Sequence, residues 1–139
     1  VGRLAIDGDK LYMACESANN FVVLDISDPL AITKTDSLAE PLDDVTGQFS
    51  KVIGQDNTAY LLTSMAEKAE LVILDVSDAS DIQIKSVFSE AGLYIYNSFA
   101  LTGHHVVLPM SFEDSEHNDL RYTHGGINMI KTRACVSSE

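Results

Sequence analysis

The sequence predicts an all-β fold in which four-stranded antiparallel sheets repeat along the chain and stack as blades of a β-propeller. The first reason is internal repetition: Phe21–Asp28 (FVVLDISD) returns fifty residues later as Leu71–Asp78 (LVILDVSD), with residue type kept at each position. Self-similarity with a period of about 40–50 residues is typical of propeller blades. The second reason is the abundance of short alternating apolar runs bounded by Gly, Asp, Asn and Ser, the pattern of strands joined by turns.

Each unit is expected to begin with a β-hairpin. The first strands are predicted at Arg3–Ile6, Lys51–Gly54 and Ser98–Leu101. Tight turns follow at Asp7–Lys10, Gln55–Thr58 and Thr102–His104, where Gly and Asn tolerate the positive φ that hairpin turns need. The second strands are predicted at Leu11–Ala14, Ala59–Leu62 and Val106–Leu108.

A polar loop then leads to a third strand, predicted at Phe21–Asp25, Leu71–Asp75 and Gly126–Ile130. A fourth, outer strand is predicted at Ile32–Thr35, Ile82–Val87 and Arg133–Val136, where apolar and polar residues alternate as in half-exposed strands. The segment Met65–Glu70 has a helix-forming composition, but it is short and lies between strands, so we expect a loop or a single turn.

The chain therefore divides into units at about 1–48, 49–96 and 97–139 of a single propeller segment. Propellers close with roughly four to eight blades, so three units predict a section of a larger propeller. The remaining blades would come from a longer protein, from further copies or from a partner chain. The alternative fold is a meandering β-sandwich that carries one duplicated strand.

The duplicated motif resembles the LVIVD repeat and the related secreted β-propeller domains of bacteria and archaea. The residues that carry the resemblance are Val22–Pro29 and Val72–Asp78. The resemblance implies an extracellular or cell-surface module used for adhesion, scaffolding or interaction. Within the motif a carboxylate that leaves the strand can accept backbone N–H groups of the following turn. We therefore assign structural turn roles to Asp25, Asp28, Asp75 and Asp78.

The charge balance restricts the partners of the chain. Its net charge of −12 argues against nucleic acid, whose binding depends on Lys and Arg. No apolar run approaches the ~20 residues of a membrane helix, so no membrane insertion is expected. The expected partners are another protein, further blades of the same chain or a homo-oligomer. Cys15 and Cys135 either form one disulfide or remain two separate thiols.

The long polar loop in the third unit, Ser111–His124, offers the best metal candidate. Its oxygen and nitrogen donors suit a cation, and hard-cation sites in loops, such as those for Ca²⁺, use such oxygens, although a simply solvated loop is the alternative. The candidate ligands are Asp114, Glu116, His117 and Asp119.

No known catalytic motif is present in the sequence, and no other cofactor is expected. The sequence thus favours a non-catalytic extracellular structural or protein-interaction module. Two alternatives are a propeller-type hydrolase or lyase whose site lies outside these residues, and a calcium-stabilised adhesion domain.

Overall fold

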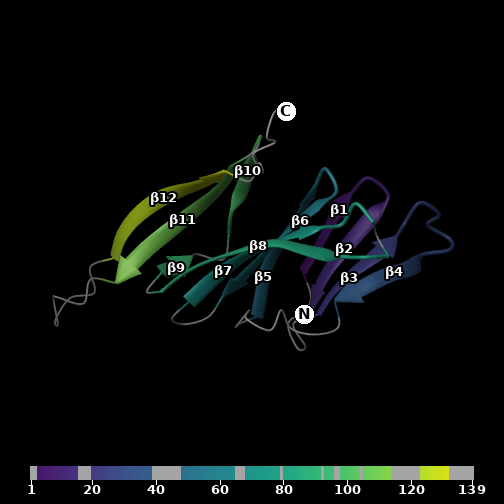
Figure 1. The fold of residues 1–139 in the computed structure, drawn as a ribbon, viewed down its shortest axis with the longest axis horizontal. Helices are drawn as coiled ribbons and strands as arrows, with labels where there is room; N and C mark the ends of the chain where they lie inside the picture. The colour runs from purple at the N-terminus through teal and green to yellow at the C-terminus, as the bar shows by residue number, and fades with distance from the viewer. Residues whose placement is uncertain are drawn as a thin grey trace, which may run out of the picture.

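The computed structural model describes residues 3–15, 20–38, 48–64, 68–78, 80–91, 93–95, 98–103, 105–113 and 123–131. Within these ranges every regular element is a β-strand, and the strands form three antiparallel sheets that follow one another in a row (Figure 1). The all-β prediction and the four-stranded unit are confirmed, and the three sheets do not close into a ring. No helix in the described residues is long and apolar enough to cross a membrane.

The first two sheets have the strand order of a propeller blade, in which each strand pairs with its neighbour in the chain. The first sheet contains β1 (Arg3–Asp7), β2 (Lys10–Cys15), β3 (Asn20–Asp25) and β4 (Thr33–Leu38). The second contains β5 (Gln48–Gln55), β6 (Thr58–Ser64), β7 (Lys68–Asp75) and β8 (Gln83–Ala91). The expected loop at Met65–Glu70 is wrong for Lys68–Glu70, because the pairing of β7 with β8 extends through these residues and overrides their helix-forming composition.

The third sheet departs from this pattern. It contains β9 (Leu93–Ile95), β10 (Ala100–Thr102), β11 (His105–Glu113) and β12 (Thr123–Lys131). Both β9 and β10 pair with β11, one at each end, so the first strand of this unit is present in two pieces. The expected loop over Ser111–His124 is too long, because the β11–β12 ladder extends to the pair Glu113 and Thr123. The predicted strand Arg133–Val136 lies outside the described residues.

The two copies of the motif occupy equivalent places in their sheets. A β-bulge interrupts the pairing of β3 with β4 between Val23 and Leu24, and the same irregularity interrupts β7 and β8 between Ile73 and Leu74. The backbone bond from Ile26 N to Asp9 O is repeated as the bond from Val76 N to Asn57 O. The two copies of the repeated sequence therefore adopt the same local structure.

The turns of the hairpins use positive φ. In the β5–β6 turn both Asp56 (φ 52°) and Asn57 (φ 57°) are left-handed, as a two-residue type I′ turn requires. Glycine supplies this conformation in the other two hairpins, at Gly8 (φ 59°) and Gly103 (φ 56°). Such turns match the twist of the flanking strands and so fix the register of each hairpin.

Strand alternation divides the core into two layers. Along β6, Ala59 and Leu61 pack toward the first sheet, whereas Tyr60 and Leu62 pack toward the third. The layer between the first two sheets also contains Tyr12, Ala14, Phe21, Val23, Phe49, Val52, Val72, Leu74, Val76 and Ile82. The layer between the second and third contains Leu71, Ile73, Phe99, Val106 and Leu108. The middle sheet is therefore covered on both faces.

Candidate functional site

The motif aspartates bond the backbone of the turn that follows each third strand. The Oδ1 atoms of Asp25 and Asp75 accept the N–H groups of Ser27 (2.8 Å) and Ser77 (2.9 Å). Two further bonds of the same kind run from Leu30 N to Asp28 Oδ1 and from Ser80 N to Asp78 Oδ1, each 2.9 Å long. All four carboxylates thus accept a backbone donor two residues ahead, which is Asx-turn geometry.

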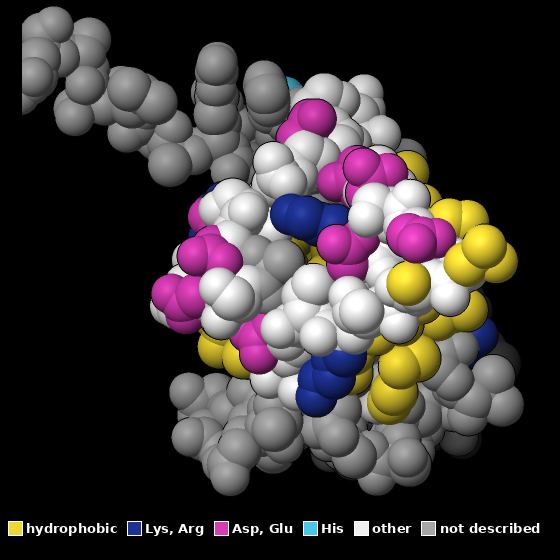
Figure 2. All heavy atoms as spheres, turned by 90° about the vertical axis from the view of Figure 1, so that its right-hand side faces the viewer, with side chains coloured by type: hydrophobic (Ala, Val, Ile, Leu, Met, Phe, Trp, Pro, Cys, Tyr) yellow, Lys and Arg dark blue, Asp and Glu magenta, His cyan; other side chains and the backbone are white. Residues whose placement is uncertain are grey.

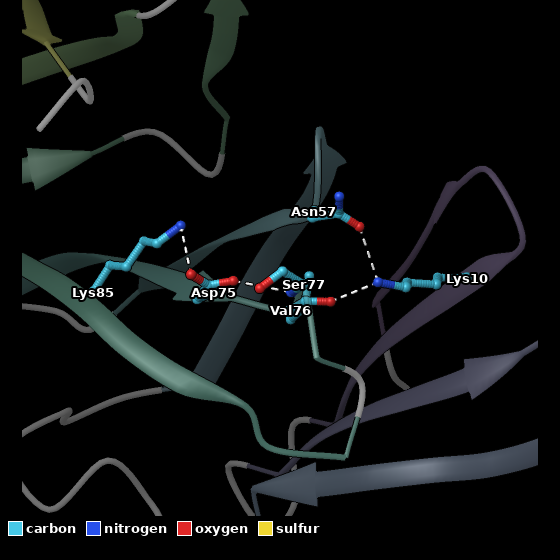
Figure 3. Close-up of polar contacts among 6 residues, drawn as sticks. All are labelled: Lys10, Asn57, Asp75, Val76, Ser77 and Lys85. Carbon is cyan, nitrogen blue, oxygen red and sulfur yellow. Dashed lines mark hydrogen bonds and ion pairs between the residues drawn. The ribbon is translucent and has the colours of Figure 1, made fainter. Parts of the chain in front are cut away.

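The carboxylate of Asp75, in the second copy of the turn, has stronger hydrogen-bonding partners than that of Asp25 in the first. Hydrogen bonding by the Ser77 side chain, and then by Lys85, holds the pKa of Asp75 far below its ordinary value. Lys85 Nζ lies 2.9 Å from Asp75 Oδ2 (Figure 3). In the first copy the position of Lys85 is taken by Thr35, whose Oγ1 donates instead to Val23 O. Hydrogen bonds from Ser27 lower the pKa of Asp25 without any lysine.

Lys10 connects the first sheet to the second. Its Nζ atom donates to Val76 O at 2.6 Å and to Asn57 Oδ1 at 3.0 Å (Figure 3). The backbone N–H of Asn57 also donates to Asp7 Oδ2 across the same boundary, at 3.3 Å. The β5–β6 turn is therefore bound on two sides by the hairpin of the preceding sheet.

A second lysine connects the second sheet to the third. Lys51 Nζ donates to Phe99 O at 2.7 Å and to Ser98 Oγ at 3.3 Å, and it lies 5.3 Å from the centre of the Phe99 ring. A propeller enzyme would need converging polar side chains around residues 4–6, 51–53 and 98–100, and within these three stretches only Lys51 and Ser98 are polar. Through these hydrogen bonds Lys51 joins the second sheet to the third.

Sequence reasoning missed both lysines. The partners of Lys10 lie 47 and 66 residues away, and those of Lys51 lie 47 and 48 residues away. The two lysines also stand at different places in their units, Lys10 beginning β2 and Lys51 within β5. The repeat pattern therefore gives no signal for either inter-sheet bond.

The other candidate residues fall mostly beyond the described part of the chain. Asp114, Glu116, His117 and Asp119 lie outside the described residues, and so does Cys135. Cys15 is half-buried in β2 and, among the residues that the structure describes, is a free cysteine. Among the residues that the structure describes, no three His, Cys, Asp or Glu side chains gather as metal ligands.

The comparisons with known proteins agree with the architecture. A family model described as the LVIVD repeat matches residues 1–37 and 64–89, which contain the two motif copies. No curated protein and no solved structure gives a significant match to the chain. The predicted resemblance is thereby confirmed for these two segments, which match the LVIVD repeat.

Proposed function

We propose that the chain is a non-catalytic structural and protein-interaction module, which contributes β-propeller blades to a larger extracellular or cell-surface assembly. The observation that carries the proposal is that polar side chains of the chain form hydrogen bonds between sheets and within turns. Lys10 and Lys51 join successive sheets, and the motif aspartates bond their own turns. These groups hold repeated sheets in register with one another.

The extracellular part of the proposal is supported by the LVIVD repeat alone. The resemblance implies a surface module, and an acidic chain with net charge −12 stays soluble there. Protease treatment of intact source cells tests this part. Cleavage of the native protein before the membrane is breached is the expected result, and protection until lysis contradicts it.

The non-catalytic part is tested at Lys51 and Ser98, whose polar side chains meet between the second and third sheets. The purified chain and its Lys51→Met and Ser98→Ala variants are assayed on chromogenic esters, glycosides and phosphates. The expected result is no turnover above buffer for any of them, with lower unfolding stability for Lys51→Met. Turnover that disappears in both variants would contradict the non-catalytic proposal and would indicate a hydrolytic site that includes Lys51 and Ser98.

A further inference from the structure

The first sheet presents an apolar face that none of the described residues covers. Two rows of side chains cross its first three strands on the side away from the second sheet. The register aligns Leu4, Met13 and Val22 in one row, and Ile6, Leu11 and Leu24 in the other. Leu4 is 62% exposed and Ile6 is 65% exposed, whereas the other four are half-buried. We call these six residues the outer face, and Figure 2 shows hydrophobic side chains exposed among acidic ones at this end of the molecule.

The equivalent face of the second sheet is buried. The hairpin registers match Leu4 with Val52, Met13 with Leu61 and Leu11 with Ala59, and the motif offset matches Val22 with Val72 and Leu24 with Leu74. All five of these partners are 6% exposed or less, because the first sheet packs on them. The outer face therefore has the composition of a surface on which another sheet of this repeat packs.

The loop after the third strand shows the same difference, with a side chain that is buried in the second unit and exposed in the first. Ile82 is 5% exposed and packs in the layer between the first and second sheets, where its N–H reaches Asp36 Oδ2 at 3.4 Å. Its equivalent in the first unit, Ile32, is 54% exposed. A side chain that the second unit buries against its predecessor is thus left bare in the first unit.

The opposite end of the row offers the complementary face. In the first and second sheets this face carries the directly opposed pairs Ala5–Tyr12 and Ile53–Tyr60, which pack against the next sheet. The third sheet carries Ala100 opposite Val107 at the same place. Ala100 is exposed and Val107 only half-buried, and the two end sheets lie at opposite ends of the row (Figure 1).

We propose that the outer face binds the far face of the third sheet of a second copy of this chain, head to tail. This inference rests on the proposed function and names its partner. The two end faces differ, so the contact joins unlike surfaces and closes only as a ring. The described sheets of two copies number six, within the four to eight with which propellers close, whereas the three described sheets of one copy do not close into a ring.

Self-association is tested by sedimentation velocity over a range of concentrations. The wild-type chain is expected to form a dimer of twice the chain mass. Because each copy carries a net charge of −12, added salt should tighten the dimer by screening repulsion. Leu4→Asp places a charge on the outer face and should weaken dimerisation at least tenfold. Val87→Asp, at a 40% exposed apolar position on β8, is the matched control and should leave the dimer intact.

A mixing experiment tests the head-to-tail arrangement. Ala100→Arg should weaken the dimer as Leu4→Asp does, because it alters the opposite face. Mixing the two variants pairs the intact outer face of one with the intact far face of the other. Association should then return, through a single contact and more weakly than in the wild type. Circular dichroism of each variant checks that the sheets are kept.

Three results would overturn the proposal: a wild-type chain that stays monomeric, a dimer that survives Leu4→Asp, or an Ala100→Arg variant that dimerises normally. The first would assign the outer face to a different occupant, and the last would indicate that two outer faces meet. None of these results bears on catalysis or on location at the cell surface. Turnover in the substrate assays, by contrast, would remove the proposed function whatever the oligomeric state.

Discussion

The ring of Tyr12 in the first sheet lies directly against the backbone of Gly54 in the second. A Cβ atom built on Gly54 would overlap the Tyr12 ring atoms Cε2 and Cδ2. The ring is fully buried and also stacks on Phe21, with centroids 5.9 Å apart. The absence of a side chain at Gly54 therefore sets how closely the two sheets approach.

Gly54→Ala is expected to destabilise the chain by about 1–3 kcal/mol, the usual cost of overpacking a filled core. The added methyl group must displace Tyr12 or separate the sheets. Urea denaturation followed by circular dichroism measures the loss. In a Tyr12→Val background, which copies the valine at the equivalent Val107, the cost of Gly54→Ala should largely disappear. An equal cost in both backgrounds would show that the ring is not the cause.

Tyr12→Phe is expected to stabilise the fold. The Tyr12 hydroxyl is buried, and no hydrogen-bond partner is present among the described residues. An unpaired buried hydroxyl costs roughly 1–3 kcal/mol, so removing it while keeping the ring should raise the free energy of unfolding by about 1 kcal/mol at pH 7. A loss of stability on this substitution would indicate that the hydroxyl has a partner. Thermal denaturation of both proteins provides the comparison.

The same tyrosine gives an alkaline pH dependence. Burial, and then the nearby charge of Asp7, raises the pKa of Tyr12 from 10.0 to about 12. The unfolded chain therefore releases this proton first, so the fold loses stability as the pH rises from about 10 to about 12. The Tyr12→Phe variant should lack this part of the loss, and the stability gap between the two proteins should widen over that interval. A gap that stays constant would contradict the shift.

Lys10→Met tests the bond between the first two sheets. The substitution leaves Val76 O and Asn57 Oδ1 without their donor, and hydrogen bonds to a charged group contribute about 1.5–3 kcal/mol. A loss of about 1–2 kcal/mol is expected, because Met keeps the apolar part of the side chain and Asn57 is exposed. Lys34→Met, at an exposed position on β4, is the control and should change stability by less than about 0.5 kcal/mol. Equal effects would show that net charge, not the inter-sheet bond, is responsible.

Local pattern was sufficient to predict the repeated elements but not the contacts between sheets. The alternation around Phe21 and Leu71 and the glycine turn at Gly8 act within a few residues, so the sequence reveals them. The meeting of Tyr12 with Gly54 depends on the distance between two sheets, which no local pattern encodes. The extension of β7 through Lys68–Glu70 has the same origin, since pairing with β8 decides it against local propensity.

The two copies of the motif turn allow an internal comparison of their carboxylates. Lys85 helps to lower the pKa of Asp75, whereas Thr35 occupies the equivalent position near Asp25. Lys85→Thr should raise the pKa of Asp75 toward that of Asp25, and Thr35→Lys should lower the pKa of Asp25. Carboxyl carbon NMR titration measures both values. A pKa of Asp75 that is unchanged in Lys85→Thr would leave the Ser77 hydrogen bonds as its full cause.

The stability change in Lys85→Thr should follow the titration of Asp75. A carboxyl whose pKa is lowered by folding stabilises the fold above its ordinary value of 3.8, and this contribution is lost as the pH falls through its folded pKa. The variant should therefore be less stable than the wild type at pH 6, by less than about 1 kcal/mol because solvent screens this exposed pair. The difference should shrink steadily as the pH is lowered below 3.8. A difference that persists undiminished into strong acid would assign the effect of Lys85 to packing along β8 and not to its charge.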